Sequence, residues 1–281
     1  MTAPTLSQEE LRLWSEWLAE EYGLHFGPER RDTLRNRLEP RRAALGLPSY
    51  EDLLFHVRFH PEREAERTRL VPHLTNNESY FCRERGTLEV LRDAVLPELR
   101  ERLGAGGVLR VLSAACASGE EVYTLAILAR ESGLFAPGQV RITGIDLDPC
   151  ALARAHAAVY GEHAFRGTDP AFRERWFRPV GDERWEVRPE LREGVELRRA
   201  NLVDERWWSG LPPQHVVLCR NVLIYFGDEA LARAAEGLHR VLAPGGALFL
   251  GHAETLRRVG TPLQVERRPG AIFYRRSEED A

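Results

Sequence analysis

The stretch GVLRVLSAACASGEEVYTLA, residues 107–126, decides the fold. It opens with an apolar run, passes through a turn of small residues and continues into an expected helix over 120–132. A short apolar run that ends at turn residues is typical of a buried strand. The stretch therefore predicts a strand, a turn and a helix in succession, the unit from which parallel α/β sheets are built.

The same alternation extends on both sides of this stretch. Helices are expected over 88–96, 148–160 and 228–242, and strands over 107–116, 140–147, 215–219 and 247–251, with APGG before the last of these strands. The tail LQVERRPGAIFYRR, residues 263–276, predicts two more strands joined at Pro269 and Gly270. This order predicts an α/β fold with a mostly parallel sheet, helices on both faces and an antiparallel last strand.

Residues 1–72 differ from the rest because they show helical periodicity and little strand signal. Ser7 and Glu10 form a capping-box sequence, which starts a helix that Gly23 ends. Apolar residues at helical spacing give this helix one buried face: Leu11, Trp14, Leu18 and Tyr22.

A run of arginines follows on a second helix, or on a helix pair interrupted at Pro40: Arg30, Arg31, Arg35, Arg37, Arg41 and Arg42. Such a run is either a solvated face or a surface for an acidic partner. A later segment, residues 162–202, is rich in charge and turns and too long for a simple connection. We expect an insertion there, with a short helix and a small antiparallel element before a strand at 195–202.

Composition narrows the functional classes. The net charge of −4 argues against a general nucleic-acid binder, and all 39 basic residues are arginine, so lysine nucleophiles and Schiff bases are excluded. The four cysteines are far apart and show no metal or redox spacing. With no signal peptide and no membrane span in the sequence, we expect a cytoplasmic protein without a disulfide framework.

The turn at 113–121, SAACASGEE, follows the first strand, where a parallel sheet binds its ligands. It lacks the glycine spacing of a dinucleotide site and the Lys of a phosphate loop. Glu120 and Glu121 occupy the positive end of the next helix and would repel phosphate. A cationic or neutral ligand is therefore expected.

Asp146 ends the second strand, where a carboxylate can accept hydrogen bonds from both hydroxyls of a ribose. Asp148, before Pro149, is interpreted as a helix N-cap. Arg220 and Asn221 interrupt the apolar run VVLCRNVLIYF, residues 216–226, although a buried charge needs a partner. A turn of small residues, a helix that starts with two glutamates and a carboxylate placed to bind ribose together suggest S-adenosylmethionine.

Five ordered stretches resemble the chemotaxis receptor glutamate O-methyltransferases, the CheR family: TNNESYFCRE (75–84), SAACASGEEVYTLA (113–126), DLDPCALARAHAAVYG (146–161), CRNVLIYF (219–226) and GHAETL (251–256). The resemblance implies a helical domain over 1–72, a linker over 73–86 that contributes to the cofactor site, and a Rossmann-like methyltransferase domain over 87–281. It also implies an antiparallel β-subdomain inserted at about 162–200.

The resemblance also assigns roles to residues. Arg83 and Tyr225 are expected to orient the methyl transfer. The expected contacts with S-adenosylmethionine, or its product S-adenosylhomocysteine, are Asn77, Ser79, Arg83, Asp146, Asn201, Leu202, Arg220, Asn221 and one or both of Glu120 and Glu121. No metal is expected.

Two departures from the family accompany the match. The linker reads Thr75-Asn76-Asn77 and Tyr80-Phe81-Cys82-Arg83, where the family usually has Thr-Thr-Asn and Phe-Phe-Arg. The segment FRPVGDERWEVRP, residues 177–189, is shorter than in members that dock on a receptor's C-terminal pentapeptide, and it lacks their Gly-rich turn. We therefore predict that no such tether is used.

The implied reaction is methylation of glutamates on the helical bundle of chemotaxis receptors. A glutamate is ionised at pH 7, so no general base is required and the task is alignment. Two alternatives stay open: a carboxyl methyltransferase for another protein or a small molecule, and a regulatory module that binds S-adenosylmethionine without turnover.

Overall fold

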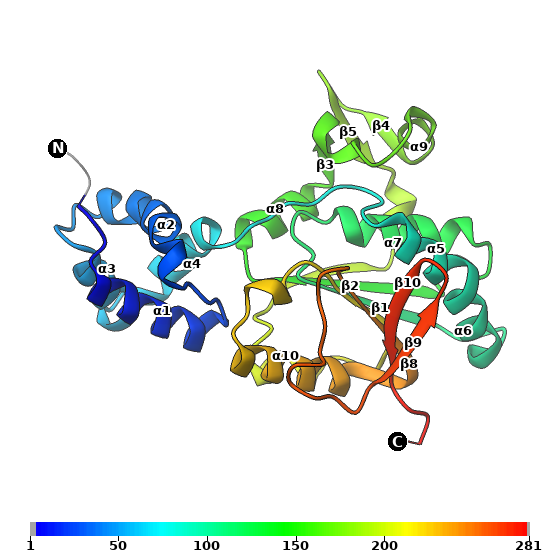
Figure 1. Cartoon of the computed structure of the whole chain (residues 1–281). Helices are drawn as coiled ribbons and strands as arrows, with labels where there is room; N and C mark the ends of the chain where they lie inside the picture. Colours follow the sequence, from blue (N-terminus) through cyan, green and yellow to red (C-terminus); the bar gives the residue numbers. More distant parts are fainter. Residues whose placement is uncertain (1–3, 280–281) are drawn as a thin grey trace.

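A computed structural model describes residues 4–279 as a helical N-terminal part joined to a larger α/β part (Figure 1). The N-terminal part contains α1 (Gln8–Tyr22), α2 (Arg31–Ala44), α3 (Tyr50–Phe59) and α4 (Arg63–Leu74). The predicted capping box of α1 is confirmed, since Ser7 and Glu10 exchange side-chain and backbone hydrogen bonds, and Gly23 ends the helix in the left-handed conformation. The indole Nε1 of the buried Trp14 donates to the carbonyl of Tyr50 at 2.9 Å, which ties α1 to the start of α3.

Five of the six arginines lie on one helix, because α2 continues through Pro40, whereas Arg30 ends the preceding 3₁₀ helix, Pro28–Arg30. Its arginines do not form one free face. Arg41 makes a bidentate ion pair with the buried carboxylate of Glu66 at 2.6 and 2.7 Å, and Arg42 pairs with Glu39. Arg37 donates to the carbonyl of Leu74. Of the rest, Arg31 is exposed, and Arg35 is half-buried and lies 3.5 Å from a carboxylate oxygen of Asp32.

The α/β part is built on a seven-stranded sheet in the order β6-β2-β1-β7-β8-β10-β9. Its strands are β1 (Leu109–Ala114), β2 (Val140–Asp146), β6 (Val195–Arg199), β7 (Gln214–Cys219), β8 (Leu242–Leu250), β9 (Gln264–Arg268) and β10 (Ala271–Arg275). The first five in the sheet order pair in parallel, whereas β10 is antiparallel to both β8 and β9. The mostly parallel sheet with an antiparallel last strand is confirmed.

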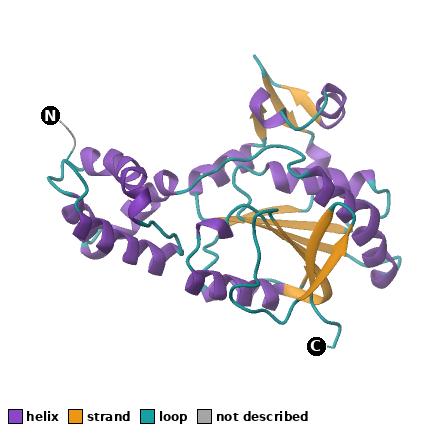
Figure 2. Cartoon of the chain, in the orientation of Figure 1, coloured by secondary structure: helices purple, strands orange, loops and turns teal. Residues whose placement is uncertain are grey.

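Helices cover both faces of the sheet, and each face has its own apolar core (Figure 2). On one face lie α5 (Arg85–Val90), a π-helical turn (Leu91–Val95), α6 (Leu96–Leu103), α7 (Glu120–Glu131) and α8 (Pro149–Ala157), and on the other lies α10 (Asp228–Val241). Short 3₁₀ helices span Pro28–Arg30, Glu162–Phe165, Pro189–Leu191, Glu205–Gly210 and Leu223–Tyr225. No helix among the described residues is long and apolar enough to cross a bilayer.

Several expected boundaries were wrong. The helix expected over 88–96 is part of a helical run from Arg85 to Leu103, and the strand expected over 195–202 ends at Arg199. The helix predicted over 148–160 ends at Ala157, because Ala158 turns into the left-handed region and the chain enters β3 (Val159–Gly161). APGG does not separate α10 from the next strand, because β8 begins at Leu242 and runs through it, with an irregularity in its pairing to β7. The divisions at residues 72 and 86 stay predictions; α4 extends to Leu74.

The expected small antiparallel element is present as a second sheet, in the order β3-β5-β4, with β4 (Phe177–Pro179) and β5 (Arg184–Val187). It includes β3 and is accompanied by α9 (Pro170–Trp176). Phe81 of the linker packs in its core, with ring centroids 4.9 Å from those of Tyr160 and Phe177. The linker is thus held by the small sheet.

Candidate active site

A cavity of about 260 Å³ lies at the carboxyl ends of β1, β2 and β7 and is lined partly by the N-terminal part. The structure brings nearly all sequence-predicted site residues to its wall: Asn77, Ser79, Arg83, Glu121, Asp146, Asn201, Leu202, Arg220, Asn221 and Tyr225. Glu120 is the exception. Lining residues of the N-terminal part were not predicted. They include His25 and Phe26 in the loop after α1 and Arg37 on α2, and local sequence patterns do not show how two distant parts of a chain pack.

The turn after β1 approaches the cavity with its backbone. Ala115 and Ala117 both adopt left-handed conformations, with φ of 65° and 49°, and line the cavity. Gly119 has φ of 91°, and a Cβ there would meet the Cβ of Ala155 at 2.8 Å. Small residues are therefore required along this turn, as the sequence suggested.

Asp146 is a buried carboxylate fixed by two backbone donors. One oxygen accepts from the N–H of Ala117 at 2.8 Å and the other from the N–H of Asp148 at 2.8 Å. Burial raises the pKa of Asp146, although these donors oppose the shift. A carboxylate has about four acceptor positions, so each oxygen can still accept a ligand hydroxyl.

Asp148 caps α8, as predicted, by accepting from Cys150 N at 2.7 Å. Its other oxygen accepts from the side-chain amide of Asn77 at 2.5 Å and from the hydroxyl of Thr75 at 3.2 Å. The N-cap thus also anchors the linker beside the cavity.

Glu120 and Glu121 occupy different environments, which bears on the open question of which one contacts the cofactor. Glu120 is buried, accepts from the Ser118 hydroxyl and does not line the cavity, and its burial raises its pKa. Glu121 lines the cavity and accepts from the Ser113 hydroxyl at 2.6 Å. Of the pair, Glu121 is therefore the candidate for ligand contact.

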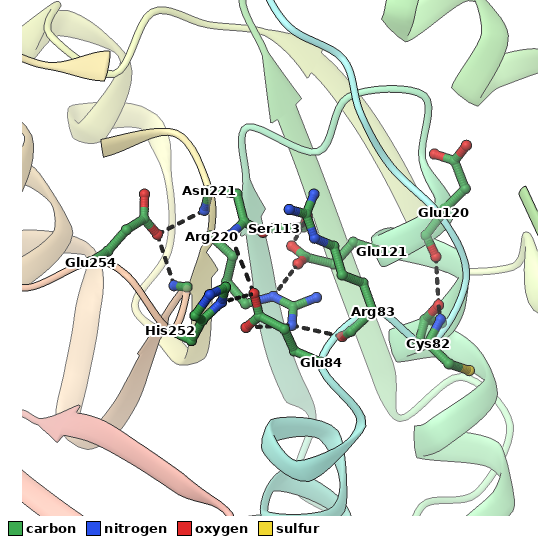
Figure 3. A network of polar contacts seen from close by, with 12 residues as sticks. Cys82, Arg83, Glu84, Ser113, Glu120, Glu121, Arg220, Asn221, His252 and Glu254 are labelled. Atoms are coloured by element: carbon green, nitrogen blue, oxygen red, sulfur yellow. Dashed lines mark hydrogen bonds and ion pairs between the residues drawn. The ribbon is translucent and has the colours of Figure 1, made fainter. Parts of the chain in front are cut away.

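Arg220 is paired although its side chain is only 4% exposed. Its Nε donates to Glu121 at 2.7 Å, and its Nη1 donates to the carbonyl of Arg83 at 2.9 Å and lies 3.4 Å from a carboxylate oxygen of Glu84 (Figure 3). Burial alone would lower the pKa of Arg220, but the two carboxylates raise it. The charge in the apolar run is thus balanced by Glu121 and by Glu84, which the sequence analysis missed.

Tyr225 lies at the end of the short helix Leu223–Tyr225. Its phenol oxygen accepts from the Asn76 amide at 3.0 Å, and its carbonyl accepts from the N–H of His25 at 2.9 Å. A β-bridge between Leu24 and Phe226 adds to this contact. The loop that carries Tyr225 therefore touches both the linker and the N-terminal part.

The cavity walls fit a nucleoside with a cationic centre. Asp146 offers acceptors for ribose hydroxyls, Glu121 offers a second carboxylate, and the alanine turn leaves room against the backbone. Within residues 4–279, no three His, Cys, Asp or Glu side chains gather in a way that could hold a metal ion.

Two family models match adjacent parts of the chain. One, described as the CheR methyltransferase all-alpha domain, matches residues 9–75, and the other, the CheR methyltransferase SAM binding domain, matches residues 77–270. The chain belongs to the CheR methyltransferase family. The predicted family and α/β fold class are confirmed, and S-adenosylmethionine is the cofactor.

Curated relatives match over nearly the full length. The chain is 34% identical over 271 residues to chemotaxis protein methyltransferase 1 of Pseudomonas aeruginosa, covering 95% of this chain and 97% of the relative. It is 33% identical to a chemotaxis protein methyltransferase of Vibrio parahaemolyticus, covering 97% and 99%. A probable biofilm formation methyltransferase, WspC of Pseudomonas putida, is 33% identical, with 94% of this chain matching 61% of that protein. The chain is thus a methyltransferase of the chemotaxis type.

Proposed function

We propose that this protein methylates glutamate side chains of chemotaxis receptors, giving glutamate methyl esters and S-adenosylhomocysteine. The observation that supports this best is that one cavity joins the cofactor-type walls of Asp146 and Glu121 to Arg83 and Tyr225. A guanidinium and a phenol hydroxyl are both donors that suit a carboxylate.

When bound, S-adenosylmethionine supplies a methyl group on a positively charged sulfur. Asp146, Glu121, Asn77, Ser79, Asn201, Leu202, Arg220 and Asn221 are proposed to hold the cofactor. Arg83 donates to the carbonyl of Glu78 at 2.8 Å, and its guanidinium carbon lies 5.7 Å from the centre of the Tyr80 ring. Its remaining donors, with the Tyr225 hydroxyl, are proposed to orient the substrate carboxylate.

Such a site needs alignment and no proton acceptor. The substrate carboxylate is ionised at pH 7, since glutamate titrates near ~4.3. Holding a nucleophile at attack distance can supply roughly 7 to 11 kcal/mol of the barrier. The side chains around the cavity therefore act as a fixed frame of donors and acceptors.

The proposed substrate is the cytoplasmic helical bundle of a receptor, which places the enzyme in the cytoplasm. Arg31, which is exposed, and Arg35, which is half-buried beside Asp32, are proposed to attract this acidic surface. The turn between β4 and β5 is short, from Val180 to Glu183, which supports independence from a receptor pentapeptide. Calorimetry with such a peptide should give no heat of binding, and tight binding would contradict this part of the proposal.

The deciding experiment incubates the protein with labelled S-adenosylmethionine and cytoplasmic fragments of several receptors, then releases methanol with base. Base-labile label in receptor glutamates is expected. Label only in another protein or a small molecule would indicate a different carboxyl substrate, whereas binding without any transfer would indicate a regulatory module.

A further inference from the structure

We propose that Glu254 is a positioning residue for methyl transfer, which shapes the loop 220–225 through its backbone. The inference rests on the proposed function only for the role of Tyr225. Glu254 belongs to the stretch GHAETL, whose role is not explained by the cavity, because Glu254 does not line the cavity. Its carboxylate lies on the side of Asn221 away from Glu121 (Figure 3).

The carboxylate of Glu254 accepts four backbone hydrogen bonds. Oε2 accepts from the N–H of Asn221 at 2.7 Å and of Gly251 at 2.8 Å. Oε1 accepts from the N–H of Leu223 at 2.7 Å and of Ile224 at 3.3 Å. One side chain thus saturates the acceptor capacity of a carboxylate with main-chain donors.

The loop has a specific need for such an acceptor. Asn221 adopts φ of 61°, a left-handed conformation that few residues other than glycine and asparagine adopt. The N–H groups at the start of a short helix, here those of Leu223 and Ile224, have no partner within the helix. Glu254 provides that partner from outside the loop and so holds the left-handed turn and the helix start together.

The strand pairing brings Glu254 to this place. β7 and β8 are parallel neighbours, with Cys219 opposite Leu250, so the segments after both strands emerge side by side. Glycine at position 251 permits this close approach, because a Cβ there would lie 2.6 Å from the side-chain amide nitrogen of Asn221. The carboxylate therefore ties the end of one strand to the loop after the next.

Four cavity residues lie in this loop: Arg220, Asn221, Val222 and Tyr225. A loosened loop would move all four together. Glu254 should therefore affect cofactor binding and transfer without touching either the cofactor or the substrate.

The test compares Glu254→Gln with Glu66→Gln. Glutamine keeps the size of Glu254 but presents an NH₂ group to two of the four backbone donors. Glu66 is a matched control because its buried carboxylate pairs with Arg41 and neither residue lines the cavity. For each variant, Tm is measured by calorimetry, the Kd for S-adenosylhomocysteine by titration, and amide exchange peptide by peptide.

Both variants should have a lower Tm. Only Glu254→Gln should weaken the binding of S-adenosylhomocysteine, at least about tenfold, and accelerate amide exchange in residues 219–226. Unchanged affinity and exchange in Glu254→Gln would overturn the proposal. The proposal would also be overturned if Glu66→Gln lost as much affinity for S-adenosylhomocysteine as Glu254→Gln when both lose the same amount of Tm. If Glu254→Gln does not fold, Glu254→Asp, which keeps the charge on a shorter side chain, is held to the same criteria. Neither readout needs a receptor, so failure of receptor methylation in the unmodified protein is a separate outcome.

Discussion

The side-chain amide of Asn76 donates a 3.0 Å hydrogen bond to the phenol oxygen of Tyr225. The direction of this bond matters, because an amide N–H occupies an acceptor position of the phenol and leaves its own hydrogen free. Tyr225 is therefore set up as a donor toward the cavity that it lines. Asn76 is also a position where the linker departs from the family pattern.

Replacing Tyr225 with Phe should lower kcat while leaving cofactor affinity nearly unchanged. A hydrogen bond to a charged group contributes roughly 1.5 to 3 kcal/mol, so kcat should fall about ten- to hundredfold. Steady-state methylation of a receptor fragment and titration with S-adenosylhomocysteine measure the two effects. Equal losses in both, or no loss in either, would rule out the orienting role.

Replacing Asn76 with Asp should reverse the hydrogen bond, because a carboxylate can only accept. The phenol hydrogen would then be donated to the introduced carboxylate and withdrawn from the substrate, so kcat should fall by about as much as in Tyr225→Phe. The double variant Asn76→Asp/Tyr225→Phe should be no slower than the slower single variant. Additive losses would show that Asn76 acts independently of the phenol.

Removing the Arg220 charge should destabilise the fold as well as the site. In Arg220→Met the carboxylates of Glu121 and Glu84 lose their buried partner, and breaking such a pair costs about 3 to 5 kcal/mol of unfolding free energy. Adding Glu121→Gln should recover part of this loss. Urea unfolding measures both steps, and an Arg220→Met variant as stable as the unmodified protein would contradict the pairing.

The raised pKa of Asp146 predicts a pH dependence of cofactor affinity. Burial makes the Asp146 carboxyl hold its proton more tightly in the folded protein than in the unfolded chain. Its contribution to stability is therefore fully present below the ordinary aspartate pKa of about 3.9 and is lost as pH rises through the raised value. Ribose hydroxyls prefer the ionised carboxylate, so affinity should change in the opposite sense and fall as pH falls through that value.

Titrations with S-adenosylhomocysteine from pH 7.5 down to the ordinary aspartate pKa of about 3.9 check this expectation. Asp146→Asn is the control, since its amide does not titrate: its affinity should be lower at pH 7 but less dependent on pH. Parallel pH profiles for the two proteins would assign the dependence to another group.

The arginines of α2 predict a salt-dependent rate. Arg31→Glu/Arg35→Glu should lower kcat/KM for receptor methylation at low ionic strength, and the difference should shrink at ~1 M salt, where screening extends over only about 3 Å. Cofactor affinity should not change. Arg42 is unsuitable for this test because its ion pair with Glu39 is more buried than that of Arg35 with Asp32, so its reversal would disturb the helix itself. Equal rates at low salt would mean that Arg31 and Arg35 are merely solvated.

Local patterns in the sequence predicted much of the fold. Ser7 with Glu10, Asp148 before Pro149, and the small residues around Gly119 each act on their own neighbours, so their structural consequences follow from short range. The resemblance added the identity of the cavity wall. Glu120 and Glu121 remained unresolved because adjacent helical residues point in different directions, which only the helix orientation determines.

Contacts between distant segments were beyond reach of such patterns. Glu84 pairs with Arg220 only because the linker crosses the end of β7, and Glu254 reaches Asn221 only because β7 and β8 are neighbours in the sheet. His25 meets Tyr225 through the packing of the N-terminal part on the α/β part. These contacts depend on strand order and packing of the two parts, which periodicity does not encode.

The bridge between Leu24 and Phe226 also limits how the chain can be recombined. A chimera that takes its N-terminal helices from one relative and its sheet from another would create mismatched surfaces at the cavity wall, even if both halves folded. Exchange should succeed only when 24–26, 75–77 and 220–226 are inherited from the same parent. For protein engineering, the functional module is therefore this noncontiguous set of segments. The boundary between the N-terminal part and the α/β part is an unsuitable junction for a chimera.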